Sequence, residues 1–499
     1  MRNGEEHEFL QNSSNFENKL NIRFETTGCR LNQIESESAA KKFVDEGFEV
    51  FLEPLTAKSE IDENTALCII NTCAVTQKAE QKDRRIIRLV LEKCPNAVVV
   101  VTGCYAQLSP DYIREMGNRV ACLPGQIKSR LASVPSLLLK KLSANDFEPV
   151  AFAKELNSSL FVRNDGKDGI SENAFALSTD SFLAHSRSSI KIQDGCNNRC
   201  SYCTINAARG HSVSLDVQTV IDRVVQLEKA GQAEVVFTSV NIGQYRGKYG
   251  EEYLDFAHLL NLCLEKTEKI SMRISSLYPE VVDDYFCQVI KNPRVRPHFH
   301  ISVQSGSDAV LKAMARRYFS KDVLEACNKI KAVKDNPFLA CDIITGFPGE
   351  TEKDFEDSMT LCKNCGFAWV HVFPFSARPG TVAFSMKQKV PQAVSGERAA
   401  RLNEWAAESK RNYIDSCRGK VFDAVLETVK KSYLFTGNSG KAVYHAVTEN
   451  FLHCEIEADS SAVNVKPGSK VKLRILGQVE QGLKKGGETE CRAEFVFDK

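Results

Sequence analysis

The sequence predicts an α/β protein in three parts: an open α/β sheet domain, an incomplete (β/α)6 barrel and a small OB-like β-barrel. Its 499 residues suggest about three domains of ~150 residues each. Short apolar strands alternate with helical stretches over most of the chain, which is typical of parallel α/β sheets. From residue 418 onward the pattern changes to short β runs broken by Gly and Asn, which favours a small barrel.

The composition excludes several classes of protein. A hydrophobic content of 43% and a charged content of 26% are incompatible with wholesale disorder. The formal net charge of +1 gives no bulk evidence for a polyanionic partner. The N-terminus has no apolar signal segment and no apolar run is long enough to span a bilayer, so we expect no membrane association and a cytoplasmic protein. In that reducing compartment the 18 cysteines are expected to be metal ligands or core residues rather than disulfides.

The open sheet domain is expected over residues 21–140, after a disordered tail at 1–20. Its predicted strands and helices alternate along the chain: strands at 21–27, 67–72 and 97–103, and helices at 35–46 and 76–93. Residues 141–187 are polar and contain Gly and Ser, so we interpret them as a junction with one or two short strands.

The incomplete barrel is expected over residues 188–417. Its predicted strands are 189–195, 233–240, 270–276, 298–304, 338–345 and 368–375. The helices expected between and after them are 214–230, 254–266, 280–291, 307–334, 351–365 and 395–417. Six strand-and-helix units are fewer than the eight of a complete α/β barrel. Residues 418–499 are assigned to the OB-like barrel.

A tight cysteine cluster follows the strand at 189–195. Cys196, Cys200 and Cys203 have C-x3-C-x2-C spacing, so three thiolates on one loop can surround one metal centre. A cube of four irons and four sulfides has four ligand positions, so three thiolates leave one iron open to a chelating molecule. Zinc is the alternative, but it requires a fourth ligand, and His211 is the nearest candidate. The third interpretation is that the three cysteines are close in sequence by chance.

Three further cysteines each follow a predicted strand. Cys29, Cys73 and Cys104 come directly after the strands of the first domain. Because the carboxyl ends of parallel strands line one crevice, these thiols could converge on a second site. Independent burial in the core is the competing interpretation.

These motifs identify a resemblance. The segment DGCNNRCSYCTI resembles the signature of radical S-adenosylmethionine (SAM) enzymes, whose open iron binds SAM. TTGCRLNQIESE, NTCAVT and VTGCYAQ are similar to the N-terminal domain of methylthiotransferases, and the similarity covers residues 22–480. The resemblance implies two [4Fe–4S] clusters, one bound by Cys196, Cys200 and Cys203 and the other bound by Cys29, Cys73 and Cys104. It also implies that Cys196, Cys200 and Cys203 are catalytic residues. In that family SAM supplies both a 5′-deoxyadenosyl radical and the methyl group, and the second cluster supplies the sulfur.

Further segments similar to the family follow the strands of the central domain. The resemblance implies SAM contacts by small or amide side chains at these strand ends: Ser239, Asn241, Gly243, Ser275, Ser276, Gln304 and Ser305. The segment Gly346–Glu350 belongs to the same set, and ordinary turn chemistry is the alternative for each member. Asn206 departs from the family, which more often has proline there.

Other polar residues leave alternatives open. His298 and His300 share one face of a strand, where they could bind a metal, pack in the core or contact the substrate. Arg316 and Arg317 are either a solvated helix end or a phosphate contact.

The resemblance also implies a substrate and partners. The segments GCRLNQIESE and HISVQSGSDAVLKAMARRY are most similar to the branch that inserts a methylthio group at C2 of N6-threonylcarbamoyladenosine, beside the tRNA anticodon (position 37). Sister branches act on isopentenyladenosine in tRNA or on an aspartate of a ribosomal protein, and a non-catalytic iron–sulfur RNA-binding protein is a further alternative. The C-terminal barrel resembles the TRAM module, which holds RNA. We therefore expect tRNA and an electron donor such as a flavodoxin or ferredoxin as partners, and a monomeric chain.

Overall fold

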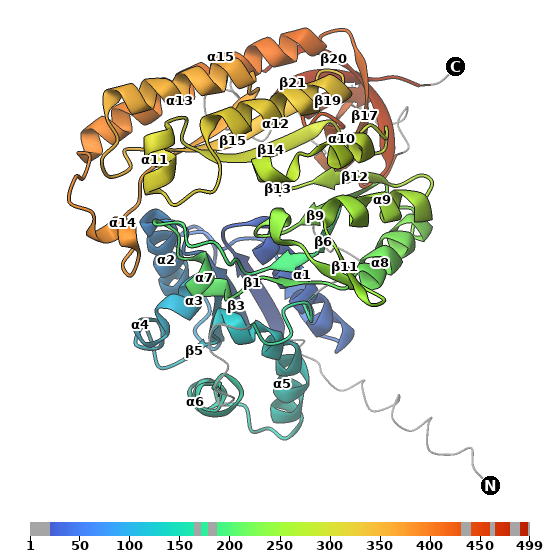
Figure 1. Cartoon of the computed structure of the whole chain (residues 1–499). Coiled ribbons are helices and arrows are strands. Elements are labelled where there is room, and N and C mark those ends of the chain that lie inside the picture. The colour runs from blue at the N-terminus through green and yellow to red at the C-terminus, as the bar shows by residue number, and fades with distance from the viewer. Residues whose placement is uncertain are drawn as a thin grey trace. The chain divides into compact units, whose positions relative to one another are not determined.

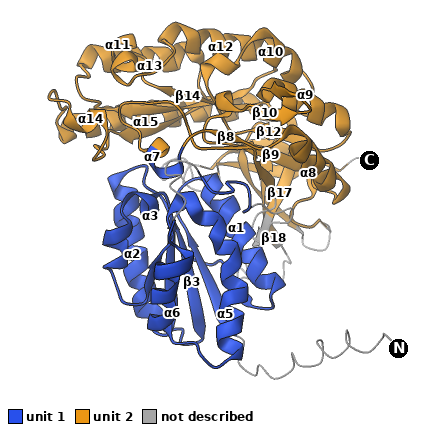
Figure 2. Cartoon of the chain, turned by 60° about the horizontal axis from the view of Figure 1, so that its bottom comes forward, with its two compact units in different colours: residues 1–179, 207–210 blue, residues 180–206, 211–499 orange. Residues whose placement is uncertain are grey.

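The computed structural model describes residues 20–163, 171–177, 187–430, 441–459, 465–479 and 490–497 (Figure 1). The chain forms two compact units: unit 1 contains residues 1–179 and 207–210, and unit 2 contains residues 180–206 and 211–499 (Figure 2). The predicted tail at 1–20 lies outside the described residues except for residue 20. Among the helices of the described ranges, none combines the length and the apolar character that a membrane span needs.

Unit 1 contains an open parallel sheet, as predicted. Its strand order is β2-β1-β3-β4-β5. The strands are β1 (Asn21–Thr26), β2 (Glu49–Phe51), β3 (Thr65–Thr72), β4 (Val98–Gly103) and β5 (Val120–Cys122). The strands β2 and β5 were not predicted, because three residues each are too few to show an alternating pattern. Every residue of β3 and β4 is buried, which is typical of a parallel sheet covered on both faces.

Helices cover both faces of this sheet. The helical elements are α1 (Arg30–Asp45), α2 (Gln77–Lys93), α3 (Cys104–Leu108), α4 (Pro110–Arg114), η1 (Gly125–Ser133), α5 (Val134–Ser143), α6 (Pro149–Glu155) and η2 (Leu156–Leu160). Successive residues of β3 point to opposite faces: Leu67 packs in the core that contains Phe43, and Cys68 packs in the core that contains Ile87. The strands expected within 141–187 are wrong for the part described, since residues 141–163 and 171–177 contain the end of α5, then α6 and η2, and no strand.

Unit 2 contains six parallel strands in chain order, which confirms the incomplete barrel. They are β6 (Ser188–Lys191), β9 (Glu234–Thr238), β12 (Ser271–Ile274), β14 (His298–Gln304), β15 (Phe338–Thr345) and β16 (Trp369–Pro374). The strands form two sheets, ordered β12-β9-β6 and β13-β14-β15-β16. The short β13 (Ser276–Leu277) continues β12 beyond a break at Ser275, so β12 pairs with β9 while its continuation pairs with β14.

Amphipathic helices connect these strands and lie along the outside of them (Figure 1). They are α8 (Val217–Lys229), α9 (Phe256–Lys266), α10 (Asp284–Ile290), α11 (Asp308–Ala313), α12 (Ser320–Val333), α13 (Glu352–Cys365), α14 (Val382–Ser385) and α15 (Gln392–Cys417). A single helix over 307–334 was predicted, and this is wrong. Ala315 has a φ of 57°, a left-handed conformation that ends α11 and separates it from α12.

The C-terminal strands close into the predicted small barrel. They are β17 (Val421–Lys430), β18 (Lys441–Thr448), β19 (His453–Asp459), β20 (Lys470–Gln478) and β21 (Cys491–Phe495), and their order around the barrel is β17-β18-β19-β21-β20. Leu426, Ile456 and Leu473 of this barrel share one hydrophobic core with Phe338 of β15 and Ile414 of α15. The barrel is therefore packed against the strands of the same unit.

A buried ion cluster lies where this barrel meets the parallel strands. Glu234 is 1% exposed and accepts hydrogen bonds from Arg273 (Nε–Oε1 2.7 Å) and Arg296 (Nε–Oε2 3.1 Å), and Arg187 lies 3.7 Å away. Arg273 also donates to the backbone oxygen of Thr448 in β18. Burial alone would raise the pKa of Glu234, but Arg273, Arg187 and Arg296 lower it from 4.5 to about 2. One carboxylate thus connects three arginines at this junction.

Candidate functional site

The C-x3-C-x2-C cysteines of unit 2 lie on the loop that follows β7 (Gln193–Asp194). Cys196 is buried, Cys200 is half-buried and Cys203 is exposed. Burial raises the pKa of the Cys196 thiol, and the neighbouring Cys200 adds to the effect. His211 Nδ1 lies 3.3 Å from Asn197 Oδ1, and the described residues contain no group of three or more His, Cys, Asp or Glu side chains that could hold one metal ion, so the structure forms no zinc site with His211. The loop therefore carries three neighbouring thiols, which as thiolates would bind a positively charged metal centre.

Arg316 contacts this loop, although the sequence indicated a solvated helix end or a phosphate contact. Its Nη1 donates to Cys200 Sγ at 3.3 Å, and its Nη2 donates to Ser302 Oγ at 3.2 Å. The guanidinium carbon lies 4.8 Å from the ring centre of Tyr278 and 4.8 Å from that of Tyr318. The break at Ala315 turns Arg316 inward, so a solvated helix end is wrong for this residue, whereas a phosphate contact stays a prediction. In the structure Arg316 holds a cysteine of the loop.

Two predicted SAM contacts carry buried hydroxyl groups without a partner. Ser239 Oγ and Ser275 Oγ, which follow β9 and β12, are inaccessible to water and make no hydrogen bond in the structure. Buried polar atoms are normally paired, so such hydroxyls indicate a place for a polar ligand. Asn241 reaches the cysteine loop, with Nδ2 3.9 Å from Cys196 Sγ. These three residues fit a polar cofactor beside the loop.

The other predicted contacts already have local partners. Asn241 Oδ1 caps the turn at Gly243, whose backbone N–H donates to it at 3.1 Å. Ser276 Oγ lies 3.1 Å from His300 Nδ1, and Gln304 Nε2 donates to Ser302 Oγ at 3.3 Å. Ser305 is 1% exposed, and its Oγ accepts from the backbone N–H of Ser307 at 3.2 Å. Turn chemistry accounts for the present contacts of Gly243 and Ser305.

The segment Gly346–Glu350 forms a locked turn after β15. Gly346 has a φ of 75°, and a Cβ there would lie 2.4 Å from Ser395 Cβ, so only glycine fits. Glu350 accepts from the Gly346 N–H at 2.9 Å and pairs with Arg398 at 2.6 Å. This ion pair holds the turn closed.

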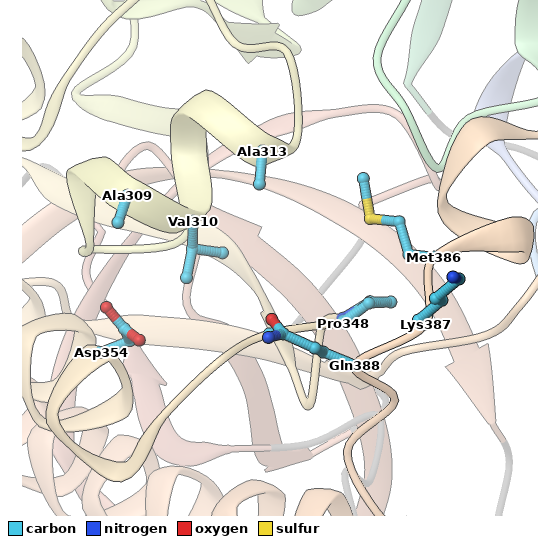
Figure 3. Close-up of a pocket in the computed structure, with 9 residues that line it drawn as sticks. Ala309, Val310, Ala313, Pro348, Asp354, Met386, Lys387 and Gln388 are labelled. Atoms are coloured by element: carbon cyan, nitrogen blue, oxygen red, sulfur yellow. The ribbon is translucent and has the colours of Figure 1, made fainter.

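A pocket of about 490 Å³ lies beside that turn (Figure 3). Ala309, Val310, Pro348 and Met386 supply apolar atoms to its lining. Asp354 also faces it, but its carboxylate already accepts from Ser307 Oγ at 2.6 Å and from Thr351 at the start of α13. Lys387 and Gln388 also line it, so the pocket presents both apolar and polar atoms.

The three cysteines of unit 1 come together at the carboxyl ends of adjacent strands. Thr72 of β3 is in register with Gly103 of β4, so Cys73 and Cys104 follow at the same level. A Cβ on Gly28 would lie 2.7 Å from Cys73 Cβ and 2.8 Å from its Sγ, and Gly28 has a φ of 88°. Burial raises the pKa of Cys73 to about 12, with Cys104 and Cys29 contributing. The structure thus brings these thiols together.

A buried charged network lies beside these cysteines. Lys128 and Arg209 both pair with Glu35, and Arg209 Nη1 lies 3.1 Å from Glu35 Oε1. Arg209 Nη2 donates to Asn32 Oδ1 at 2.7 Å, and Asn32 Nδ2 donates to the backbone oxygen of Thr72 at 3.0 Å. Residue 209 thus supports the strand ends that carry the unit 1 cysteines.

The remaining twelve cysteines are all buried and belong to neither group. In the described ranges, no group of three or more His, Cys, Asp or Glu side chains is arranged around a single metal ion. A [4Fe–4S] cube places each thiolate on a different iron, so its ligands need not converge on one point. Each group has three neighbouring thiols, one of them exposed, and such thiols fit a cluster of this kind by their chemistry.

Comparisons with known proteins agree with this geometry. The model of the Radical SAM superfamily matches residues 190–362, and that of the Uncharacterized protein family UPF0004 matches residues 21–125. The threonylcarbamoyladenosine tRNA methylthiotransferase MtaB of Treponema pallidum is 42% identical over 496 residues, covering 91% of this chain and 98% of that protein. The tRNA-2-methylthio-N(6)-dimethylallyladenosine synthase of Clostridium botulinum is 30% identical over 414 residues, covering 82% and 86%.

Among solved structures, the radical SAM methyltransferase TsrM from Kitasatospora setae covers 73% of this chain and 77% of its own, with 14% identity and a TM-score of 0.47. The family match at 42% identity over nearly the full chain agrees with the two cysteine motifs and with the α/β fold. [4Fe–4S] chemistry and SAM are thus part of its reaction. The chain belongs to the family of radical SAM methylthiotransferases that modify tRNA.

Proposed function

We propose that this enzyme inserts a methylthio group at C2 of N6-threonylcarbamoyladenosine at position 37 of tRNA. The observation that carries the proposal is the presence of a gathered set of three cysteines in each unit. Support for the substrate comes from the relatives, because the threonylcarbamoyladenosine enzyme is 42% identical and the dimethylallyladenosine enzyme 30% identical.

In this proposal the chain holds two [4Fe–4S] clusters. Cys196, Cys200 and Cys203 bind the cluster whose open iron takes SAM, and Cys29, Cys73 and Cys104 bind the second. When bound, the two clusters and SAM supply the radical, the methyl group and the sulfur. The unpaired hydroxyls of Ser239 and Ser275 and the amide of Asn241 orient SAM beside the first cluster.

The proposal also includes partners and a compartment. The reaction takes place in the cytoplasm on a monomeric chain, with a flavodoxin or ferredoxin as electron donor. The C-terminal barrel holds the RNA. Lys470 and Arg474, two basic residues of β20, are paired with acids: Lys470 lies 2.7 Å from Asp423 and Arg474 lies 2.7 Å from Glu494. Exposed pairs of this kind are weak, so phosphates can compete for these cations.

The substrate is tested by mass spectrometry of nucleosides from tRNA of cells that lack this protein. We expect the methylthio derivative of threonylcarbamoyladenosine to disappear and its unmodified precursor to accumulate. Restoring the gene restores the signal. Loss of the methylthio derivative of isopentenyladenosine would instead assign isopentenyladenosine as the substrate. An unchanged tRNA profile together with a changed ribosomal protein would assign the aspartate of that protein.

Arg316 is predicted to raise the reduction potential of the first cluster. A cation that donates to a ligand sulfur stabilises the more negative, reduced state. A hydrogen bond to a charged group contributes about 1.5–3 kcal/mol. One-electron potentials change by 59 mV for each tenfold change in the equilibrium constant, which is about 1.4 kcal/mol, so Arg316→Gln is expected to lower the potential by about 65–130 mV.

Potentiometry followed by electron paramagnetic resonance measures this shift. The signal that changes on SAM addition belongs to the first cluster, so it is followed in the fully loaded chain. The matched control is Arg317→Gln, since Arg317 is the exposed neighbour. Equal potentials in the Arg316→Gln and Arg317→Gln chains would show that Arg316 has only a packing role.

A further inference from the structure

The inner face of the sheet β13-β14-β15-β16 carries polar as well as apolar side chains, while its outer face is apolar. Phe299, Ile301, Leu339 and Cys341 are completely buried. Cys341 interacts with Cys362 of α13, so these residues face the helices. The intervening residues of the strands face the opposite side, toward the lumen of the incomplete barrel.

A hydrogen-bonded polar row crosses this inner face. Ser276 Oγ of β13 lies 3.1 Å from His300 Nδ1 of β14, and His300 Nε2 lies 3.3 Å from Asp342 Oδ1 of β15. Burial would raise the pKa of Asp342, but His300, His371 and Arg316 lower it below its usual value. Asp342 keeps 26% of its side chain exposed. The lumen thus contains an ionised carboxylate that is accessible to a ligand.

Aromatic side chains continue the row on β16, the last strand of the sheet. His371 is in register with Asp342, and its ring centre lies 5.5 Å from that of His300. Phe373, two residues further on the same face, is 41% exposed. Trp369 Nε1 donates to His371 Nδ1 at 3.3 Å, which fixes the histidine ring. An exposed aromatic surface therefore lies directly beside the accessible carboxylate.

This combination matches the chemistry of an unstacked purine. Bases that are read in single strands stack on aromatic side chains and present their edges to hydrogen-bonding groups. A carboxylate accepts from an amino group, which adenine carries on C6. Phosphates would be repelled by Asp342, so a base fits this surface better than the RNA backbone.

We propose that His371 and Phe373 stack the target base of the RNA and that Asp342 accepts a hydrogen bond from its exocyclic N6–H. This inference rests on the proposed function, because it takes the substrate to be a modified adenosine. It assigns Asp342, His371 and Phe373 to substrate recognition in the lumen of unit 2.

The test measures binding of the full, cluster-loaded chain to anticodon stem-loops by fluorescence anisotropy. Three RNAs carry adenine, purine or no base at position 37. Stacking typically contributes a factor of about ten in affinity per base. The unaltered chain is expected to prefer adenine over the abasic RNA about tenfold, and Phe373→Ala is expected to reduce this preference below about threefold. Its affinity for the abasic RNA stays unchanged.

The amino group is tested with the purine RNA, which lacks it. The unaltered chain is expected to prefer adenine over purine about fivefold, whereas Asp342→Asn is expected to show a preference of at most about twofold. The matched control is Tyr253→Ala, which removes an aromatic ring that is 66% exposed on the hairpin of β10 (Gly247–Tyr249) and β11 (Glu252–Leu254). It should keep both preferences.

A Phe373→Ala chain that keeps the tenfold preference, or an unaltered chain without one, overturns the inference. If Phe373→Ala does not fold, Phe373→Leu keeps the apolar volume and removes the aromatic face, and it must show the same loss. The nucleoside analysis is independent of these affinities. If the methylthio derivative of threonylcarbamoyladenosine is the product but the chain shows no base preference, only this inference is overturned. If a different nucleoside is methylthiolated and the preference is intact, only the proposed substrate is overturned.

Discussion

A chain carrying Cys200→Ala is expected to bind tRNA but to form no methylthiolated nucleoside. Without this thiolate the loop has two ligands left for a cluster that needs three from the protein and one from SAM. The iron content of the anaerobically reconstituted chain should fall from about eight to about four per chain. Iron analysis, tRNA binding and nucleoside mass spectrometry on one preparation measure all three effects.

The matched control for this change is Cys263→Ala, which alters a buried cysteine of α9 outside both cysteine groups. It should retain iron and product. The second group is examined with Cys73→Ala, which should also halve the iron. An unaltered, fully reconstituted chain with only four irons would contradict the two-cluster assignment, and product formation by Cys200→Ala would remove the catalytic role of the loop.

Glu234→Gln is expected to destabilise unit 2 by about 3–5 kcal/mol, the usual cost of removing one partner from a buried ion pair. The change leaves the buried Arg273 without its carboxylate partner and removes one carboxylate each from Arg296 and Arg187, which also pair with Glu449 and Glu427. Urea unfolding measures the loss. The two tryptophans of the chain, Trp369 and Trp405, both lie in unit 2, so their fluorescence reports on this unit alone.

The pH dependence gives an independent check of the same cluster. Folding lowers the pKa of Glu234 from 4.5 to about 2, so its stabilising effect is complete above about pH 4.5 and is lost as the pH falls toward 2. The Glu234→Gln chain should lack this component. Glu252→Gln, which alters an exposed glutamate of β11, is the control and should shift stability by less than about 0.5 kcal/mol. Equal stability of the two variants would contradict the prediction.

The sequence was most informative where chemistry is local. The spacing of Cys196, Cys200 and Cys203 within one loop needs no tertiary structure to be recognised. The convergence of Cys29, Cys73 and Cys104 was predictable because each follows a strand and parallel strands end at one edge, whereas their role as cluster ligands stays a prediction. The order of six strands in unit 2 followed from their regular alternation with helices.

The contacts of side chains that depend on a local irregularity or on strand register were missed. Arg316 follows Ala-Met-Ala, residues with high helix propensity, so nothing in the sequence indicates the left-handed Ala315 that turns it toward Cys200. The row from Ser276 to Asp342 spans three strands, and its contacts exist only once their register is fixed. Asp342 was not singled out from the sequence. Its one available signal was its place as the single charged residue of an otherwise apolar predicted strand.

The assignment of residues 207–210 to unit 1 has a consequence for how this chain is made (Figure 2). Arg209 is 6% exposed and balances Glu35, yet it is translated after the first strand of unit 2. A nascent chain that ends at residue 179 must therefore keep Glu35 without this cation and Asn32 Oδ1 without its donor. The first unit cannot reach its final state during early synthesis, and a gene fragment encoding it alone would require the segment from 207 to 210 to be joined to it.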